Sequence, residues 1–153
     1  MKVEYLNPFI TGTYEILKQL GISETKRGKI NLCKGGIKIN SSAVIIGLTG
    51  DINGRVIYDM DIQTSLNIAE LIIGEKRDSF DEMVKSAVGE FANMVTGRAI
   101  SILAEKGYKF KISPPTLFTG NKMEISDINI PALVVPIECE LGTIIVNLAL
   151  RKK

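Results

Sequence analysis

The chain has 153 residues, of which 45% are hydrophobic and 24% charged, a composition typical of one soluble globular domain spanning residues 1–153. Its net charge of +2 is too small to favour binding to nucleic acid or to an anionic membrane surface. The sequence contains no histidine, which excludes Ser-His-Asp and Cys-His nucleophile systems, HExxH zinc sites and phosphotransfer to histidine. Any chemistry must therefore come from carboxylates, amides, hydroxyls, thiols, lysines or arginines.

Cysteine usage and the N-terminal residues indicate the cellular compartment. Cys33 and Cys139 are too few for a disulfide framework, which favours free thiols in a reducing environment. The first residues lack the apolar segment of a secretion signal, and no apolar run is long enough to span a bilayer. We therefore expect a cytoplasmic protein that has no membrane partner and no nucleic-acid partner.

The sequence pattern predicts three helices. Asn7 followed by Pro8 predicts a first helix that begins at Pro8, with Asn7 as its N-cap and Gly21 after its end. Residues 64–73 form a short amphipathic pattern that stops at Gly74. The third and longest helix is expected to follow a capping box made by Ser79 and Glu82, and to end at about Lys106 before Gly107.

The remaining segments predict strands. Residues 29–34 alternate in polarity as a half-buried strand does, and residues 42–49 and 54–59 flank a turn, which predicts a hairpin. Residues 109–112 and 116–119 are shorter strands separated by Pro114 and Pro115, and residues 128–140 and 143–151 predict a second hairpin. Pro131 and Pro136 favour an edge position or a bulge for the first strand of that hairpin.

The order of these elements predicts an α+β fold. Hairpins dominate and strands do not alternate regularly with helices, so we expect a mainly antiparallel sheet with helices packed against it. No segment has the form of a phosphate-binding glycine loop. We interpret the glycines at residues 35–36 and 47–50 as turns between strands.

The long helix carries a polar stripe opposite an apolar face. At roughly 100° per residue, Glu82, Ser86, Glu90, Asn93 and Gly97 fall within an arc of about 80°. The apolar face comprises Phe80, Val84, Ala87, Val88, Phe91, Val95, Ala99, Ile102 and Leu103. Asparagine favours caps and turns over helix interiors, and Gly89 and Gly97 each cost the helix about 1 kcal/mol relative to alanine. This stripe indicates close approach by another surface, although a Glu-x-x-Asn pair alone is most often solvated helix surface.

Arg98 does not fit this division, because it falls near the apolar side of the helix. Its guanidinium is expected either to reach solvent at the sheet margin or to bond carbonyl groups near the helix end.

The stretch from Asp81 to Gly97 resembles the signature helix of the CheC/CheX/FliY phosphatases of bacterial chemotaxis. That signature has Ser or Asp, then Glu, then Asn, and it matches Ser86, Glu90 and Asn93. A proline follows further along in the family, and Pro114-Pro115 supplies it here. Residues 45–50 and 54–58 resemble the central hairpin of the family, and Asn7-Pro8-Phe9 resembles the first helix of its CheX branch. The match covers most of the chain.

The resemblance implies a CheC-like fold and hydrolysis of the aspartyl phosphate on a CheY-type response regulator. In the family the asparagine carboxamide orients the attacking water and the glutamate pairs with a lysine of the regulator, so Asn93 and Glu90 are the expected catalytic residues. Ser86 would be a lesser contact, and Gly89 and Gly97 would admit the partner's backbone. The resemblance further implies that magnesium is held by the regulator, that the chain has no metal site or cofactor of its own, and that it forms a homodimer through sheet edges.

Some members of the family carry a second Glu-x-x-Asn pair on the first helix, and Glu4 and Asn7 have that spacing. Because proline is not tolerated inside a helix, we interpret Asn7 as an N-cap and Glu4 as preceding the helix, which predicts the one-site, CheX-like branch. The alternative function is a non-catalytic response-regulator or flagellar-switch interaction module. An unrelated α+β protein that binds a small ligand is a third possibility, which no motif favours.

Overall fold

The structure is a computed structural model that describes the backbone of residues 3–152 and their side chains, apart from those of residues 126–129 and 152. Within these residues it has three helices and eight strands, and every strand pair is antiparallel, which confirms the predicted α+β fold. The elements are α1 (Val3–Gln19), β1 (Lys26–Arg27), β2 (Asn31–Ile39), β3 (Ser42–Gly50), β4 (Ile52–Met60), α2 (Ile62–Ile73), α3 (Glu82–Glu105), β5 (Phe110–Ile112), β6 (Thr116–Thr119), β7 (Met123–Cys139) and β8 (Gly142–Lys152).

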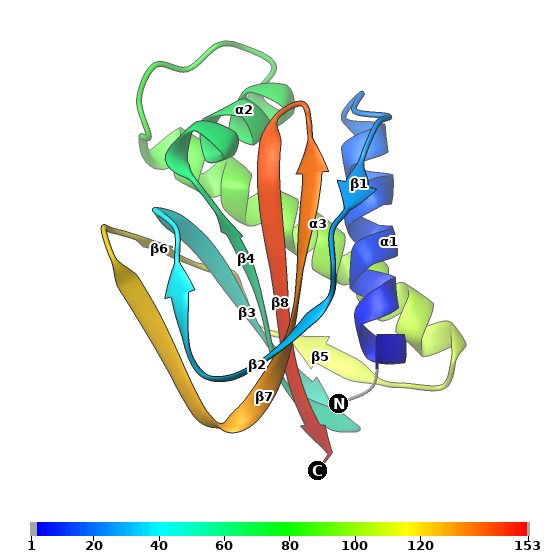
Figure 1. Ribbon diagram of the computed structural model, residues 1–153. Helices are drawn as coiled ribbons and strands as arrows, with labels where there is room; N and C mark the ends of the chain where they lie inside the picture. Colours follow the sequence, from blue (N-terminus) through cyan, green and yellow to red (C-terminus); the bar gives the residue numbers. More distant parts are fainter. Residues whose placement is uncertain (1–2, 153) are drawn as a thin grey trace.

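The strands form one curled sheet with the helices on one side (Figure 1). The main order is β1-β7-β8-β4-β3-β5, with β2 also paired to β7 and β6 also paired to β3. Helix α1 packs on β7 and β8, whereas α3 packs on β3 and β6, and the two helices contact each other. As a result, α1 and α3 cover different halves of the same sheet.

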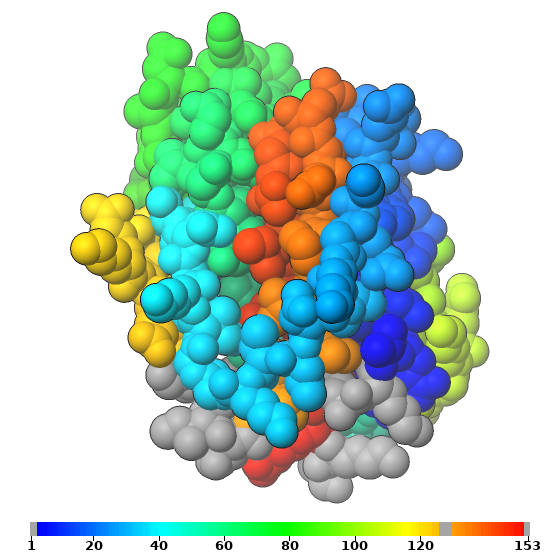
Figure 2. Space-filling view, viewed as in Figure 1, coloured from blue at the N-terminus to red at the C-terminus, as the bar shows by residue number. Residues whose placement is uncertain are grey.

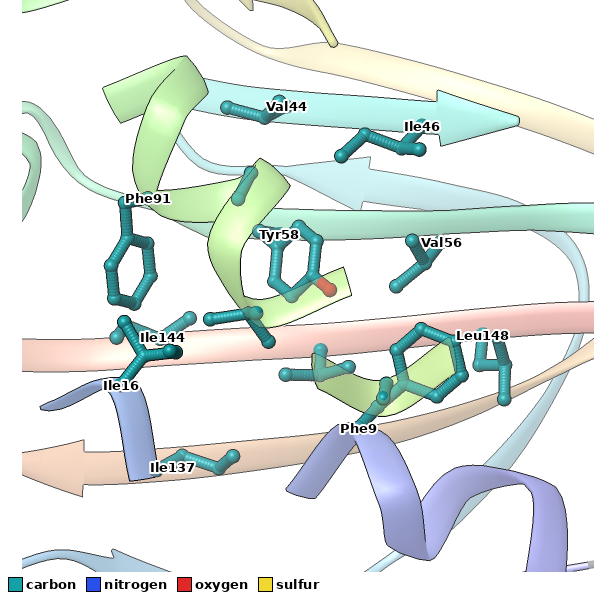
Figure 3. Packing of buried hydrophobic residues seen from close by; sticks show 14 of the residues in the cluster. Phe9, Ile16, Val44, Ile46, Val56, Tyr58, Phe91, Ile137, Ile144 and Leu148 are labelled. Carbon is teal, nitrogen blue, oxygen red and sulfur yellow. The ribbon is translucent and has the colours of Figure 1, made fainter. Parts of the chain in front are cut away.

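The main core lies between the sheet and the helices. Alternate residues of the central strands, such as Val44, Val56 and Leu148, point toward Phe9 of α1 and Phe91 of α3, and all five are fully buried (Figure 3). This alternation is what the apolar periodicity of the strands predicts. Figure 2 shows the other face of the sheet, where β1 and β2, in blue and cyan, cross the front of the molecule.

Both predicted hairpins are present, and the prolines of β7 explain its irregular pairing. Residues 128–131, which include Pro131, are skipped where the partners of β2 jump from Ala132 to Asp127, so this part of the strand is bulged. Pro136 lies in the gap between β1 and β2, where its carbonyl accepts a hydrogen bond from Gly28 N at 2.8 Å. The expectation of a bulge is confirmed, and residues 133–139 of β7 are not at an edge, because β8 pairs with them on the other side.

The predicted start of the first helix is wrong. Helix α1 begins at Val3 and includes Pro8, so Asn7 is a helical residue rather than an N-cap. The cause is tertiary packing, since Tyr5 and Leu6 are buried in the core and their burial requires helical backbone before the proline.

The predicted N-terminus of the long helix is displaced by two residues. Asp81, not Ser79, is the N-cap of α3, and its Oδ1 accepts from Val84 N at 3.0 Å. Asp81 is also paired with Arg77 at 2.6 Å, a contact that Ser79 could not make as an ion pair. The glycine pairs are also misassigned, because residues 35–36 lie within β2 and residues 47–50 within β3.

Candidate functional site

The polar stripe of α3 faces away from the core, as predicted. Glu82, Ser86 and Glu90 are exposed, whereas Asn93 and Gly97 are half-buried. The opposite side of the helix is buried and consists of Val84, Ala87, Val88, Gly89, Phe91, Ala92, Val95, Thr96, Ala99 and Leu103. The helical periodicity therefore separated the two faces, except that Phe80 precedes the helix and Ile102 is only half-buried. Gly89, Ala92 and Thr96, which were assigned to neither face, are buried.

A groove of about 540 Å³ runs along this stripe, and β6 forms its second wall. Helix α3 contributes Glu82, Lys85, Ser86, Gly89, Glu90 and Asn93, and the other wall consists of Pro115, Leu117 and Thr119. The structure thus brings the predicted residues Ser86, Gly89, Glu90 and Asn93 into one concave surface, while Gly97 lies further along the helix. The sequence analysis did not predict that Lys85, Leu117 and Thr119 line the site. Leu117 and Thr119 are two residues apart in a short strand, and this spacing could have indicated that they lie on one face.

Gly89 provides space for another part of the same chain. A Cβ atom at Gly89 would lie 3.6 Å from Pro115 Cγ, so the proline already packs over this position. Gly97 differs, because no atom lies within 4 Å of the place where its Cβ would be. Of the two interior glycines, Gly97 is therefore the one that leaves open surface.

Two hydrogen bonds fix the segment that carries Pro115. Ser113 N donates to Gly47 O at 3.0 Å, and Gly47 N donates to Ser113 Oγ at 2.8 Å. These bonds attach the connection between β5 and β6 to β3, from which Pro115 extends over α3. The groove wall is therefore anchored to the central part of the sheet.

The polar groups of the groove differ in their pairing. Lys85 Nζ lies 3.3 Å from Glu82 Oε1, so this lysine is partly neutralised within the helix. Within the described part of the chain, neither the Glu90 carboxylate nor the Asn93 carboxamide makes an ion pair or a side-chain hydrogen bond. Both groups therefore remain available to a group that enters the groove.

Helix α1 holds α3 from the side opposite the groove. A Cβ atom at Gly12 would lie 2.9 Å from Val95 O, so the two helix backbones approach closely at this crossing. Arg98 Nε and Nη2 donate to the carboxylate of Glu15 on α1, and the pKa of Glu15 is lowered mainly by this hydrogen bond. This interhelical pair explains the position of Arg98, and neither expected alternative included it.

Glu4 and Asn7 lie on one exposed face of α1, because the helix begins before them. The reason given for a single site, that Asn7 is an N-cap, is therefore wrong. The α1 pair lies on the helix that packs against β7 and β8, whereas the second wall of the α3 groove is formed by β6 and Pro115.

Three further features concern metal ions, membranes and cysteines. Within residues 3–152, no cluster of three or more His, Cys, Asp or Glu side chains has the geometry to hold a metal ion. None of the described helices is long and apolar enough to cross a bilayer. Cys33 and Cys139 are both free thiols, as predicted.

The sequence of this chain is similar to those of known proteins. Residues 42–138 match the family described as chemotaxis phosphatase CheX. The chain is 30% identical over 131 residues to the CheY-P phosphatase CheX of Thermotoga maritima, which covers 85% of this chain and 84% of that protein.

Solved structures are also similar over nearly the whole chain. A CheC-like superfamily protein from Shewanella sp. PV-4 superposes with a TM-score of 0.88 at 31% identity, covering 99% of each chain. The CheX chain in a CheX–CheY–BeF3–Mg2+ complex from Borrelia burgdorferi superposes with a TM-score of 0.81 at 34% identity, covering 99% of this chain and 100% of that one.

Proposed function

This chain belongs to the chemotaxis phosphatase CheX family, and we propose that it hydrolyses the aspartyl phosphate of a phosphorylated CheY-type response regulator through Asn93 and Glu90. The observation that carries the proposal is the groove beside α3. It presents a half-buried carboxamide and an exposed carboxylate one turn apart, opposite the core, with both groups unengaged within the described part of the chain.

The role of Asn93 follows from the chemistry of an acyl phosphate. A carboxamide is not a base at neutral pH, but it can accept a hydrogen bond from water and donate one to an oxygen. An acyl phosphate is an activated group, so its hydrolysis requires mainly a positioned water and stabilisation of charge. Asn93 would orient the attacking water once its side chain enters the regulator's active site.

The role of Glu90 is mainly docking. A carboxylate one helical turn before Asn93 can pair with a cationic side chain of the regulator, which orients the two proteins more than it assists the reaction. Ser86 would add a contact at the edge of the footprint, and the open surface at Gly97 would admit the partner's backbone. Gly89 would contribute through Pro115, whose position beside it shapes the groove.

Magnesium would be supplied by the regulator. The similar Borrelia protein forms a complex with CheY, BeF3 and Mg2+.

We further propose a homodimer and a cytoplasmic location. Among the described strands, β2 pairs with β7 alone, so its other edge has no neighbouring strand. Leu32 on β2 is 54% exposed, and this edge suits pairing with a second copy of the chain. The two free thiols fit a reducing compartment. Sedimentation of the purified protein would test the dimer, because a monomer at micromolar concentration contradicts it.

The experiment that tests the function follows the decay of a phosphorylated CheY-type regulator in the presence of wild-type, Asn93→Ala and Glu90→Ala protein. We expect Asn93→Ala to lower kcat by about 10²-fold or more with binding largely retained, because it removes the water-orienting group. Glu90→Ala should weaken binding and hydrolysis together.

The alternative, a non-catalytic interaction module, predicts a different result. Hydrolysis by the wild-type protein would then be absent for every regulator that it binds. If hydrolysis occurs but Asn93→Ala does not lower it, the assignment of Asn93 is wrong.

A further inference from the structure

A buried hydrogen-bond chain links the middle of the sheet to the helix that carries Asn93. Tyr58 Oη lies 2.7 Å from Thr96 Oγ, and Thr96 Oγ donates to Ala92 O at 2.8 Å. Tyr58 and Thr96 are both fully buried. Figure 3 shows the Tyr58 ring alongside α3, among the core side chains.

The last acceptor of these hydrogen bonds determines which hydroxyl groups donate. A carbonyl oxygen can only accept, so the Thr96 hydroxyl uses its hydrogen on Ala92 O and must accept from Tyr58. Burial raises the pKa of the Tyr58 hydroxyl above its ordinary value, so the proton that it donates is retained throughout the working pH range.

The last hydrogen bond of this series is made to the peptide group that joins Ala92 to Asn93. Ala92 O belongs to the peptide unit that joins Ala92 to Asn93, so an anchor on this oxygen restrains the backbone from which the Asn93 side chain projects. Tyr58 is itself held on both sides, because β4 pairs with β3 at Val44 and with β8 at Val146. The centre of the sheet and the Asn93 backbone are therefore connected without passing through an exposed group.

This part of α3 needs such an anchor. Gly89 and Gly97 lie on either side of Asn93, and each weakens the helix by about 1 kcal/mol relative to alanine. A reacting group must be held to within about 0.5 Å, because a displacement of about 1 Å can lower a rate by about 10²-fold.

We propose that Tyr58 and Thr96 are positioning residues that hold the Asn93 carboxamide in its productive place through the Ala92 carbonyl. The inference rests on the proposed function of Asn93. Neither residue lines the groove, so both act through the backbone of α3 and make no contact with the regulator.

The chain offers a matched control on the other helix. Thr13 of α1 is fully buried and its Oγ donates to Phe9 O at 2.8 Å, the same bond over the same spacing as in α3. Thr13→Val therefore removes an equivalent buried hydroxyl that has no connection to Asn93.

The first measurement is the kinetics of regulator dephosphorylation by Tyr58→Phe, Thr96→Val, Thr96→Ser and Thr13→Val, well below their unfolding temperatures. We expect Tyr58→Phe and Thr96→Val to lower kcat by about tenfold with KM changed less than about twofold, because docking groups are untouched. Thr96→Ser keeps the hydroxyl and should retain kcat, as should Thr13→Val. An unchanged kcat in Tyr58→Phe, or an equal loss in Thr13→Val, overturns the proposal.

The second measurement needs no regulator. Hydrogen exchange followed by NMR should show the backbone amides of Thr96 and Gly97 exchanging about tenfold faster in Tyr58→Phe, with those of α1 unchanged. Unchanged exchange in α3 overturns the proposal. If the wild-type protein hydrolyses no phosphorylated regulator, the proposed function fails, and the exchange result still decides whether Tyr58 anchors the Asn93 backbone.

Discussion

Helices α1 and α3 each present a glutamate and an asparagine at the same spacing on an exposed face, Glu4 with Asn7 and Glu90 with Asn93. The two pairs differ in their position along the helix. Asn93 lies about three turns from either end of α3, whereas Asn7 lies near the start of α1 and is followed by Pro8, which cannot donate a helical hydrogen bond. The backbone that supports Asn93 is therefore the more restrained of the two.

The surroundings of the pairs differ as well. Asn93 is half-buried in a groove whose second wall is β6 and Pro115, while Asn7 is exposed. A reacting carboxamide needs a fixed direction and a surface that orients the partner, and the groove beside α3 supplies both. We therefore propose that, of these two identical motifs, only the one to which the fold adds a rigid backbone and a second wall is a site.

Removal of each asparagine in turn tests directly whether the two pairs differ in function. We expect Asn7→Ala to leave kcat/KM for regulator dephosphorylation within about twofold of wild type, against a loss of about 10²-fold or more for Asn93→Ala. The residual rate of Asn93→Ala should not fall further when Asn7→Ala is added. A further fall in the double variant, measured in the same decay assay, would show that the α1 pair is a second working site.

Glycine substitutions on the two helices test the difference in packing through its effect on stability. Gly12→Ala puts a Cβ atom 2.9 Å from Val95 O at the helix crossing, and we expect it to lower the free energy of unfolding by about 1–3 kcal/mol. Gly89→Ala meets Pro115 Cγ at an ordinary 3.6 Å and removes a helix-weakening glycine, so it should raise stability by up to about 1 kcal/mol. Urea denaturation measures both, and equal effects of the two variants would contradict the difference in packing.

The smallest expected effect concerns the ion pair that joins the two helices. The hydrogen bond from Arg98 lowers the pKa of Glu15 below 4.5, so the unfolded chain binds a proton at Glu15 more readily than the folded one. The contribution of Glu15 to stability is therefore present above pH 4.5 and is lost as pH falls through the lowered pKa.

Glu15→Gln should accordingly lower the urea midpoint at pH 7. The decrease should be small, because the side chains of Glu15 and Arg98 are both 40% exposed and solvent screens the ion pair. The difference from wild type should shrink on acidification below pH 4.5. A difference that persists at low pH would indicate that packing, rather than charge, is what the substitution disturbs.

Local signals in the sequence predicted the elements whose ends are determined locally. Gly74 ends α2 with a positive φ of 87°, and the stripe with Glu90 and Asn93 faces outward because a helix repeats every 3.6 residues. Family resemblance then supplied the identity of the reaction, which spacing alone could not.

The errors arose where contacts outside the local helix pattern decide the outcome. Asp81 replaced Ser79 as the cap of α3, and its added pairing with Arg77 depends on how the connector folds. Helix α1 extends before Pro8 because Tyr5 and Leu6 are buried by other elements. The pairing of Arg98 with Glu15 joins residues 83 positions apart, so no local pattern could reveal it.

The second wall of the groove lies on a short strand that belongs to neither helix. Leu117 and Thr119 line the groove from β6, which is joined to the sheet through β3 alone among the described strands. Leu117 is half-buried and packs against the core, whereas Thr119 is exposed, so changes at Thr119 alter the shape offered to a partner with the least effect on the core beneath α3. Given the proposed role of Asn93, this wall of the groove can change with the partner at Thr119 while the reacting residue on α3 is retained.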